Sequence, residues 1–300
     1  MSAFVIAGVT GHVGSVVAGK LLAQGEKIAA IVRDDRRGAP WRERGAQLVI
    51  GSLDDREFLT RTLAGANGFF VLLPPNLTAE DLHAQQRRMV DVITGAVKDS
   101  AVPYVVLLSS LGAELNTGTG PIQDLHYMEE SLRAAGTKLI SIRASFFQEN
   151  LASILPVVRK AGVFPNLFPS AETAIPMIAT RDIGQVAAEL LQSPPQVSEI
   201  IDLLGPEYTA SQISEKLGSA LGQPLQLINV PSIAQVPALM QTGLSRSVAE
   251  AIVEMYAALA SGRIRPAGDR TVVGQTSLDE VLPDLVASTA SMAKSQKTAS

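Results

Sequence analysis

Residues 7–14 carry the residue types and the spacing that bind a phosphate. The stretch reads Ala-Gly-Val-Thr-Gly-His-Val-Gly, between a short apolar run at residues 4–6 and alternating apolar positions that begin at Val16. In a strand–turn–helix unit the first glycine permits the tight turn, the second lets the backbone approach a pyrophosphate, and the third lets the helix pack close to the sheet. The helix N-terminus favours an anion at the same place. The sequence therefore predicts dinucleotide binding at Gly8, Thr10, Gly11, His12, Val13 and Gly14.

A charged group after the second apolar run indicates which dinucleotide is bound. Residues 27–32 are apolar for most of their length and end in Arg-Asp-Asp-Arg-Arg at 33–37. An acidic residue at this strand end accepts a hydrogen bond from the 2′-hydroxyl of NAD, whereas an arginine pairs with the 2′-phosphate of NADP. Because Arg33 comes first, the pattern favours NADP over NAD. A solvated charge cluster explains Arg36 and Arg37 equally well.

The elements that must position these residues alternate regularly. Short apolar runs at residues 4–6, 27–32, 46–50, 68–73 and 104–108 are separated by helical periodicity, and residues 137–143 continue the pattern. Near-continuous apolar strands joined by helices imply a parallel sheet covered on both faces, with ligands outside the carboxyl ends of the strands. We therefore expect an α/β fold with a doubly wound parallel Rossmann sheet of six or seven strands. The further cofactor contacts expected at the strand ends are Ser52, Leu53, Leu73, Pro74, Pro75 and Ser109.

The alternation breaks after residue 143, which divides the chain. We expect residues 1–150 to form the dinucleotide-binding domain, with a contribution from about 177–205. Residues 151–176 and 206–287 are expected to form a smaller, helix-rich substrate lobe over the ligand-binding edge. Residues 288–300 are small and polar without an apolar period, which predicts a disordered tail.

Composition excludes several classes of function. The 300 residues have a net charge of -4, no cysteine and three histidines, none at the short spacing of a zinc motif. These facts argue against nucleic acid as a partner, and against disulfides, thiol catalysis and a metal site. No basic leader and no run of about 18 apolar residues is present, so we expect a cytoplasmic protein without a membrane segment.

Several motifs together resemble one known family. They are the GxTGxxG turn, Ile-Val-Arg-Asp at 31–34, Gly-Ser-Leu-Asp at 51–54, the helix end at 129–136, and Arg143 with Phe-Phe-Gln-Glu-Asn at 146–150. Over residues 3–286 the chain resembles the NmrA-like group of atypical short-chain dehydrogenases/reductases. The resemblance implies the Rossmann fold and an NADP cofactor. Its members include NADPH-dependent reductases of quinones, azo dyes and triphenylmethane dyes, and also proteins that bind the dinucleotide without turning it over.

The chain departs from this group at the residues that carry the chemistry. The Tyr-xxx-Lys pair of short-chain dehydrogenases is absent, because Tyr127 is followed four residues later by Ser131. In relatives that use a lysine on this helix, that lysine falls near Leu125 or His126. A hydride reductase needs a donor for the charge that develops on its acceptor, and His126, Tyr127 and Ser110 are the candidates. The simpler interpretation places the first two at the start of an amphipathic helix and the serine at the end of a strand.

The walls of a substrate cleft are expected from aromatic and apolar residues after the sixth strand. The candidates are Phe146, Phe147, Asn150, Phe164, Phe168 and Met177, for which ordinary packing between the lobes is an equally good explanation. We expect an NAD(P)H-dependent oxidoreductase that acts on a flat apolar acceptor such as a quinone, an enone or an aromatic intermediate. The alternative is a non-catalytic NAD(P)-sensing regulatory protein that binds a partner protein. The sequence leaves a homo-oligomer open.

Overall fold

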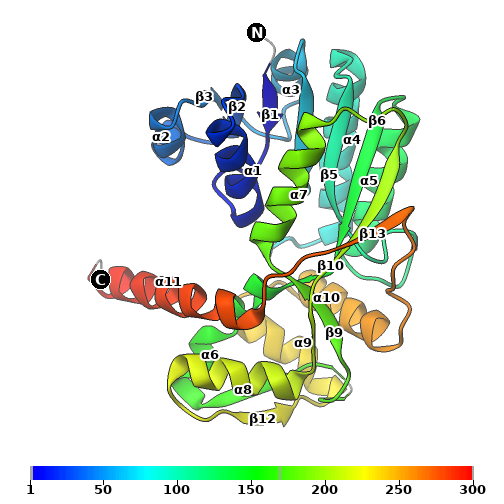
Figure 1. Cartoon of the computed structure of the whole chain (residues 1–300). Coiled ribbons are helices and arrows are strands. Elements are labelled where there is room, and N and C mark those ends of the chain that lie inside the picture. The colour runs from blue at the N-terminus through cyan, green and yellow to red at the C-terminus, as the bar shows by residue number, and fades with distance from the viewer. Residues whose placement is uncertain (1–2, 169, 299–300) are drawn as a thin grey trace.

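The fold is built on one eight-stranded sheet in which every neighbouring pair is parallel. The structure is a computed structural model that describes residues 3–168 and 170–298, with side chains described as far as residue 288. The strands of the sheet are β1 (Phe4–Ile6), β2 (Ile28–Val32), β3 (Gln47–Ile50), β4 (Gly68–Leu72), β5 (Tyr104–Ser110), β6 (Lys138–Ala144), β10 (Glu199–Leu204) and β13 (Arg270–Val273). Their order is β13-β10-β6-β5-β4-β1-β2-β3, so the predicted doubly wound Rossmann sheet is confirmed (Figure 1).

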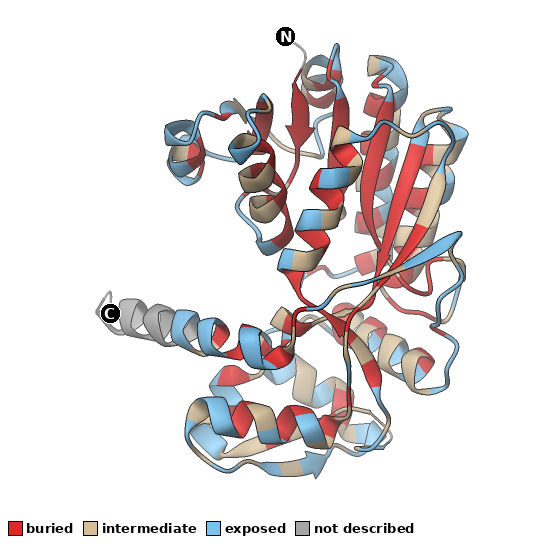
Figure 2. Cartoon of the chain, in the orientation of Figure 1, coloured by how far each residue is buried: buried red, intermediate tan, exposed pale blue. Residues whose placement is uncertain are grey.

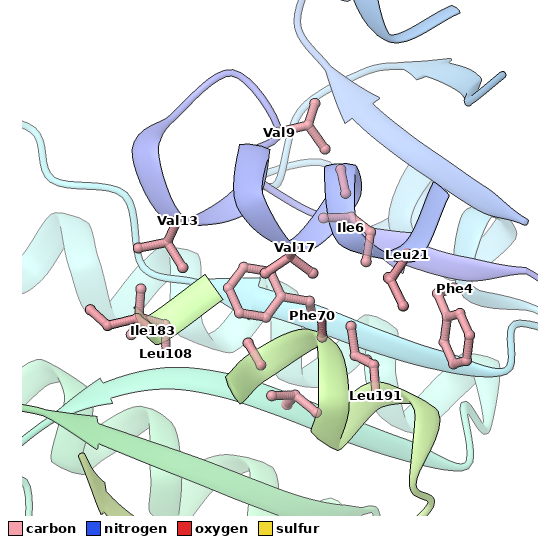
Figure 3. Close-up of a cluster of buried hydrophobic side chains, with 14 of the residues drawn as sticks. Phe4, Ile6, Val9, Val13, Val17, Leu21, Phe70, Leu108, Ile183 and Leu191 are labelled. Carbon is pink, nitrogen blue, oxygen red and sulfur yellow. The ribbon is translucent and has the colours of Figure 1, made fainter. Parts of the chain in front are cut away.

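Helices cover both faces of the sheet. The helices α1 (His12–Ala23) and α7 (Thr180–Gln192) pack on one face, and α3 (Arg56–Leu63), α4 (Leu82–Ser100) and α5 (Ile122–Ala134) pack on the other. In β1, Phe4 and Ile6 enter the first core and Val5 enters the second, because successive side chains of a strand point to opposite faces. Both faces are therefore buried, which explains the uninterrupted apolar runs (Figure 2). Figure 3 shows the first of the two cores.

The strand order reverses next to β1, and this reversal locates the ligand-binding edge. β1 pairs with β2 on one side and with β4 on the other. From β1 the chain continues through β2 and β3 on one side of β1, and after β3 it returns to β4 on the other side of β1. This reversal opens a crevice at the carboxyl ends of β1 and β4. The helix α2 (Asp35–Glu43) follows β2 at this edge.

The eighth strand lies inside a segment that the sequence analysis assigned to the smaller lobe. β13 pairs with β10 from Ile201↔Arg270 to Leu204↔Val273. The carboxylate of Asp269 accepts a hydrogen bond from the Ile200 N–H at 2.7 Å, which fixes the register at the start of the pair. Residues 270–273 thus return from the lobe and cover the edge of the sheet. This run is short and has no apolar period, so the sequence gave no signal for a strand there.

The described part of the smaller lobe combines short strands with one 3-10 helix and five α-helices. The strands β7 (Phe146–Phe147), β9 (Ile175–Ile178) and β11 (Glu207–Tyr208) form a three-stranded sheet, and β8 (Val163–Asn166) pairs with β12 (Gln226–Asn229). Around them lie the 3-10 helix η1 (Gln148–Ser153) and the helices α6 (Leu155–Ala161), α8 (Ala210–Leu221), α9 (Ser232–Gln241), α10 (Arg246–Ala260) and α11 (Leu278–Thr298). The lobe sits below the main sheet in Figure 1, at the end where α1 begins.

The end of the chain is helical, where the sequence predicted disorder. α11 continues to Thr298, although residues from 288 onwards were expected to form a disordered tail. Beyond Pro283 the segment contains neither glycine nor proline, and its alanine, lysine and glutamine residues have good helix propensity. Residues 299 and 300 lie outside the described part of the chain. Among the described residues, no helix is long and apolar enough to cross a membrane.

Candidate functional site

The turn between β1 and α1 has the geometry of a phosphate-binding loop. Gly8 has a φ of 71°, the left-handed region that favours glycine. A methyl group at Gly14 would overlap the Gly8 carbonyl, whose carbon would lie 2.5 Å away. The N-cap of α1 is Gly11, and no side chain caps the first turn. The N–H groups that begin α1 therefore have no partner inside the helix and can bind an anion.

The residues at the end of β2 separate into a structural acid and an exposed base. The carboxylate of Asp34 caps α2 by accepting a hydrogen bond from the Arg37 N–H at 2.8 Å. Arg33 is exposed and takes part in none of the ion pairs formed by the described side chains. The Asp34 carboxylate is thus engaged in capping α2, while the guanidinium of Arg33 remains accessible beside the phosphate turn.

The other expected cofactor residues lie at the same edge with different environments. Ser52 and Leu53 follow β3 and are half-buried, and Leu73 and Pro74 follow β4 in the same state, with Pro75 exposed. The Pro74 carbonyl accepts a hydrogen bond from the Gln86 side chain at 3.1 Å, which ties this loop to the first turns of α4.

Ser109 points into a buried ionic cluster that the sequence analysis missed. Its hydroxyl donates to Glu129 at 2.7 Å, and Arg143 donates to the same carboxylate at 3.1 and 2.8 Å. Glu129 is fully buried and Arg143 is 4% exposed as a side chain. Burial alone would lower the pKa of Arg143, but its hydrogen bonds to Glu129 and the nearby carboxylates raise it. The Ser109 hydroxyl is therefore engaged in the interior, and a contact with a cofactor would come from its backbone.

The three candidate proton donors lie in different surroundings. The Nδ1 atom of His126 is 2.8 Å from the Ala113 carbonyl, which can only accept, so Nδ1 carries the proton and Nε2 is left for other contacts. The Tyr127 hydroxyl donates to Asp91 at 2.6 Å, in the middle of α4, and this bond raises the pKa of the phenol. The Ser110 hydroxyl donates to the Leu111 carbonyl at 3.0 Å. The structure therefore directs Tyr127 towards α4, and His126 towards the loop that follows β5.

A second histidine pairs with a buried carboxylate between α4 and α5. The Nδ1 atom of His83 lies 2.7 Å from Asp124, whose side chain is 1% exposed. Burial raises the pKa of the Asp124 carboxyl, opposed by His83 and by Arg87 at 3.5 Å. The sequence held no local signal for this pair because its members are 41 residues apart.

The helix α10 connects the lobe to the ligand-binding edge at two places. The Ser245 N–H donates to the Leu77 carbonyl at 3.0 Å, and its hydroxyl donates to the Ala79 carbonyl at 2.6 Å. The Ser247 hydroxyl accepts from the Leu82 N–H at 3.0 Å, at the start of α4. Further along α10, Ala258 packs on Leu111, Ala113 and Ile122 of the β5–α5 connection. One helix therefore bridges the loops that follow β4 and β5.

Some of the expected cleft residues are core residues of the lobe. Phe164 and Met177 are 5% and 0% exposed inside a cluster with Leu151 and Leu155, and Phe147 packs against the main core. Asn150 is exposed in η1. Phe146 and Phe168 instead meet the ring of Tyr256, from α10, at centroid distances of 6.1 and 5.0 Å. Phe146, Phe168 and Tyr256 thus form an aromatic group beside the core of the lobe.

Comparison with protein families agrees with this geometry. A model of the NmrA-like family matches residues 2–265. The chain belongs to the NmrA-like family. The resemblance inferred from the sequence motifs is thereby confirmed, together with its Rossmann fold.

Two characterised relatives of the chain are reductases. It is 26% identical over 256 residues to an NAD(P)H azoreductase of Xenophilus azovorans, covering 84% of this chain and 85% of that protein. It is 27% identical over 237 residues to a (4-alkanoyl-5-oxo-2,5-dihydrofuran-3-yl)methyl phosphate reductase of Streptomyces griseus, covering 78% and 79%.

Solved structures share the fold at lower identity. The triphenylmethane reductase of Citrobacter sp. complexed with NADP(H) matches with a TM-score of 0.79 at 17% identity, covering 94% of this chain and all of that one. The NADPH-dependent quinone oxidoreductase of Escherichia coli complexed with NADPH matches with a TM-score of 0.78 at 19% identity, covering 94% and 99%.

Proposed function

We propose that this NmrA-like protein is an NADPH-dependent reductase of a flat, apolar acceptor such as a quinone, an enone or an aromatic intermediate. The observation that carries the proposal is the turn of Gly8, Gly11 and Gly14, in which Gly8 has a positive φ and a side chain at Gly14 would overlap the Gly8 carbonyl. The reductase relatives and the NADP(H)-bound structural neighbours support the same assignment.

Each part of the dinucleotide has residues that fit it. The pyrophosphate would lie on the N-terminus of α1, and the 2′-phosphate would pair with Arg33, because Asp34 is engaged in capping α2. The backbone after β3 and the loop of Leu73 and Pro74 would border the adenine and nicotinamide ends. When bound, the cofactor supplies a hydride to the acceptor.

His126 is the proposed proton donor. Its Nδ1–H is held by the Ala113 carbonyl, so it would donate from Nε2 in the imidazolium form. This orientation by a fixed carbonyl is typical of a positioned imidazole. We do not assign this role to Tyr127, because its hydroxyl is bonded to Asp91.

The experiment is a panel of quinones and enones assayed with NADPH, followed by loss of NADPH absorbance. We expect turnover by the wild type, and His126→Ala to lower kcat by roughly 10²-fold at neutral pH, within the range for a general acid. Full activity in His126→Ala would exclude this residue as the donor. Binding of NADP and NADPH without turnover of any acceptor would instead favour the NAD(P)-sensing regulator.

A further inference from the structure

Three aromatic rings from distant parts of the chain meet where the lobe faces the sheet. Phe146 begins β7, two residues after the end of β6, Phe168 follows β8, and Tyr256 lies on α10. The ring of Phe168 meets Tyr256 edge-on at 82°, and Phe146 is tilted by 40° against it. We call Phe146, Phe168 and Tyr256 the aromatic trio. All three residues are half-buried, and Phe146 and Phe168 also pack against the core of the lobe.

The hydroxyl of Tyr256 differs from those of the other tyrosines. Tyr104 donates to the Leu191 carbonyl, Tyr127 donates to Asp91, and Tyr208 accepts from the Leu278 N–H. Tyr256 has no hydrogen-bond partner among the described residues, and its oxygen is not among their fully enclosed unpaired polar atoms. Burial raises the pKa of Tyr256 to about 12. The group is therefore a neutral phenol that has a proton to donate and no acceptor in the part of the chain that the structure describes.

The helix that carries Tyr256 is held firmly against the ligand-binding edge. Ser245 and Ser247 bind the loop after β4 and the start of α4. A side chain at Gly120, in the β5–α5 connection, would overlap the Ala251 carbonyl, so α10 lies directly on this connection. Because α10 is fixed to the loop after β4 and to the β5–α5 connection, the phenol has a defined position relative to these two strand ends.

We infer that Tyr256 donates a hydrogen bond to a carbonyl oxygen of a planar acceptor that lies against Phe146 and Phe168. This inference rests on the proposed function and narrows its acceptor to conjugated ketones and quinones. Hydride arrival at such an acceptor places negative charge on the oxygen, and a preorganised donor stabilises that charge. The phenol keeps its own proton in this role.

Tyr256→Phe tests the inference because it keeps the ring and removes only the hydroxyl. In calorimetric titrations of NADP-saturated protein, we expect the variant to bind naphthoquinone about 2- to 10-fold more weakly, the value of one neutral hydrogen bond. Binding of naphthalene, which has no oxygen, should be unchanged. In assays with NADPH, kcat/KM for naphthoquinone should fall by roughly 10²-fold.

The matched control is Tyr104→Phe, which removes a phenol hydroxyl at the start of β5, the opposite edge of the sheet. It should leave both affinities and kcat/KM near the wild-type values. Equal weakening of naphthoquinone and naphthalene by Tyr256→Phe, unchanged naphthoquinone affinity, or no binding of naphthoquinone by the wild type would each overturn the inference. If the wild type binds naphthoquinone but reduces no acceptor, the proposed function fails and the calorimetry still decides the role of Tyr256.

Discussion

Removing the carboxylate of Glu129 is expected to destabilise the fold strongly, because it removes the buried partner of a buried charge. Glu129 is fully buried and accepts hydrogen bonds from Ser109 and from two nitrogens of Arg143. Arg143 is itself 4% exposed, and its remaining partner is Glu114 at 3.1 Å. Breaking a buried pair by removing one member costs about 3–5 kcal/mol. We expect Glu129→Ala to lower the free energy of unfolding by this amount.

The same helix offers a matched control. Glu130 is the next residue, its side chain is 58% exposed, and it forms an ion pair with Arg133 at 2.5 Å. An exposed pair of this kind contributes at most about 0.5–1 kcal/mol, so Glu130→Ala should be almost neutral. Both variants remove one negative charge from neighbouring positions of α5. Their comparison therefore separates burial from net charge and from helix propensity.

Urea unfolding followed by circular dichroism, and thermal unfolding, measure the difference. With an unfolding entropy of ~2.1 cal/mol/K per residue over 300 residues, a loss of 3–5 kcal/mol corresponds to a fall in Tm of roughly 5–8 °C. Glu129→Gln keeps the shape and part of the hydrogen bonding, and should fall between the two alanine variants. Equal effects of Glu129→Ala and Glu130→Ala would refute the argument that the buried ionic cluster stabilises the fold.

Two further predictions concern the cofactor and the response to pH. Arg33→Ala should weaken NADPH binding roughly 10- to 100-fold, the value of a charge-assisted contact, and leave NADH binding nearly unchanged in fluorescence titrations; equal weakening of both would contradict the 2′-phosphate assignment. Hydrogen bonds from the Ser277 N–H and hydroxyl and from Arg181 lower the pKa of Glu280 from 4.5 to about 2. A carboxyl whose pKa is lower in the folded state stabilises the fold at a pH above its pKa in the unfolded state. This stabilisation is lost as the pH falls through the pKa in the folded state. Glu280→Gln should therefore be less stable than the wild type at pH ~7 and equal to it near pH ~2. A stability difference that is the same at both pH values would contradict this assignment.

Features encoded within a few neighbouring residues were predicted from the sequence. The phosphate turn, the exposed Arg33 after β2, and the buried strands of the sheet depend on local chain geometry and on the period of apolar residues. These signals repeat along the chain, and together they specify a doubly wound sheet and the edge at which a dinucleotide binds. The family membership follows from the same local motifs.

Partnerships between distant residues were not predicted. Ser109 was expected at the cofactor, but its hydroxyl bonds Glu129, which lies on another element and also holds Arg143. Tyr256 gave no signal as a site residue, since its neighbours Phe146 and Phe168 are distant in the sequence. Phe164 and Met177 are of residue types that form cleft walls as well as cores, and only their burial identifies them as core residues.

The sequence by itself therefore determined the Rossmann sheet, the glycine turn between β1 and α1 and the place of Arg33 at the end of β2, because each is specified by adjacent residues. Only the tertiary structure decided which hydroxyls are already bonded within the protein, that β13 returns to the sheet, and that α10 brings Tyr256 against Phe146 and Phe168. Such choices depend on packing between elements that are far apart in the chain, and the local pattern of apolar and polar residues does not record them.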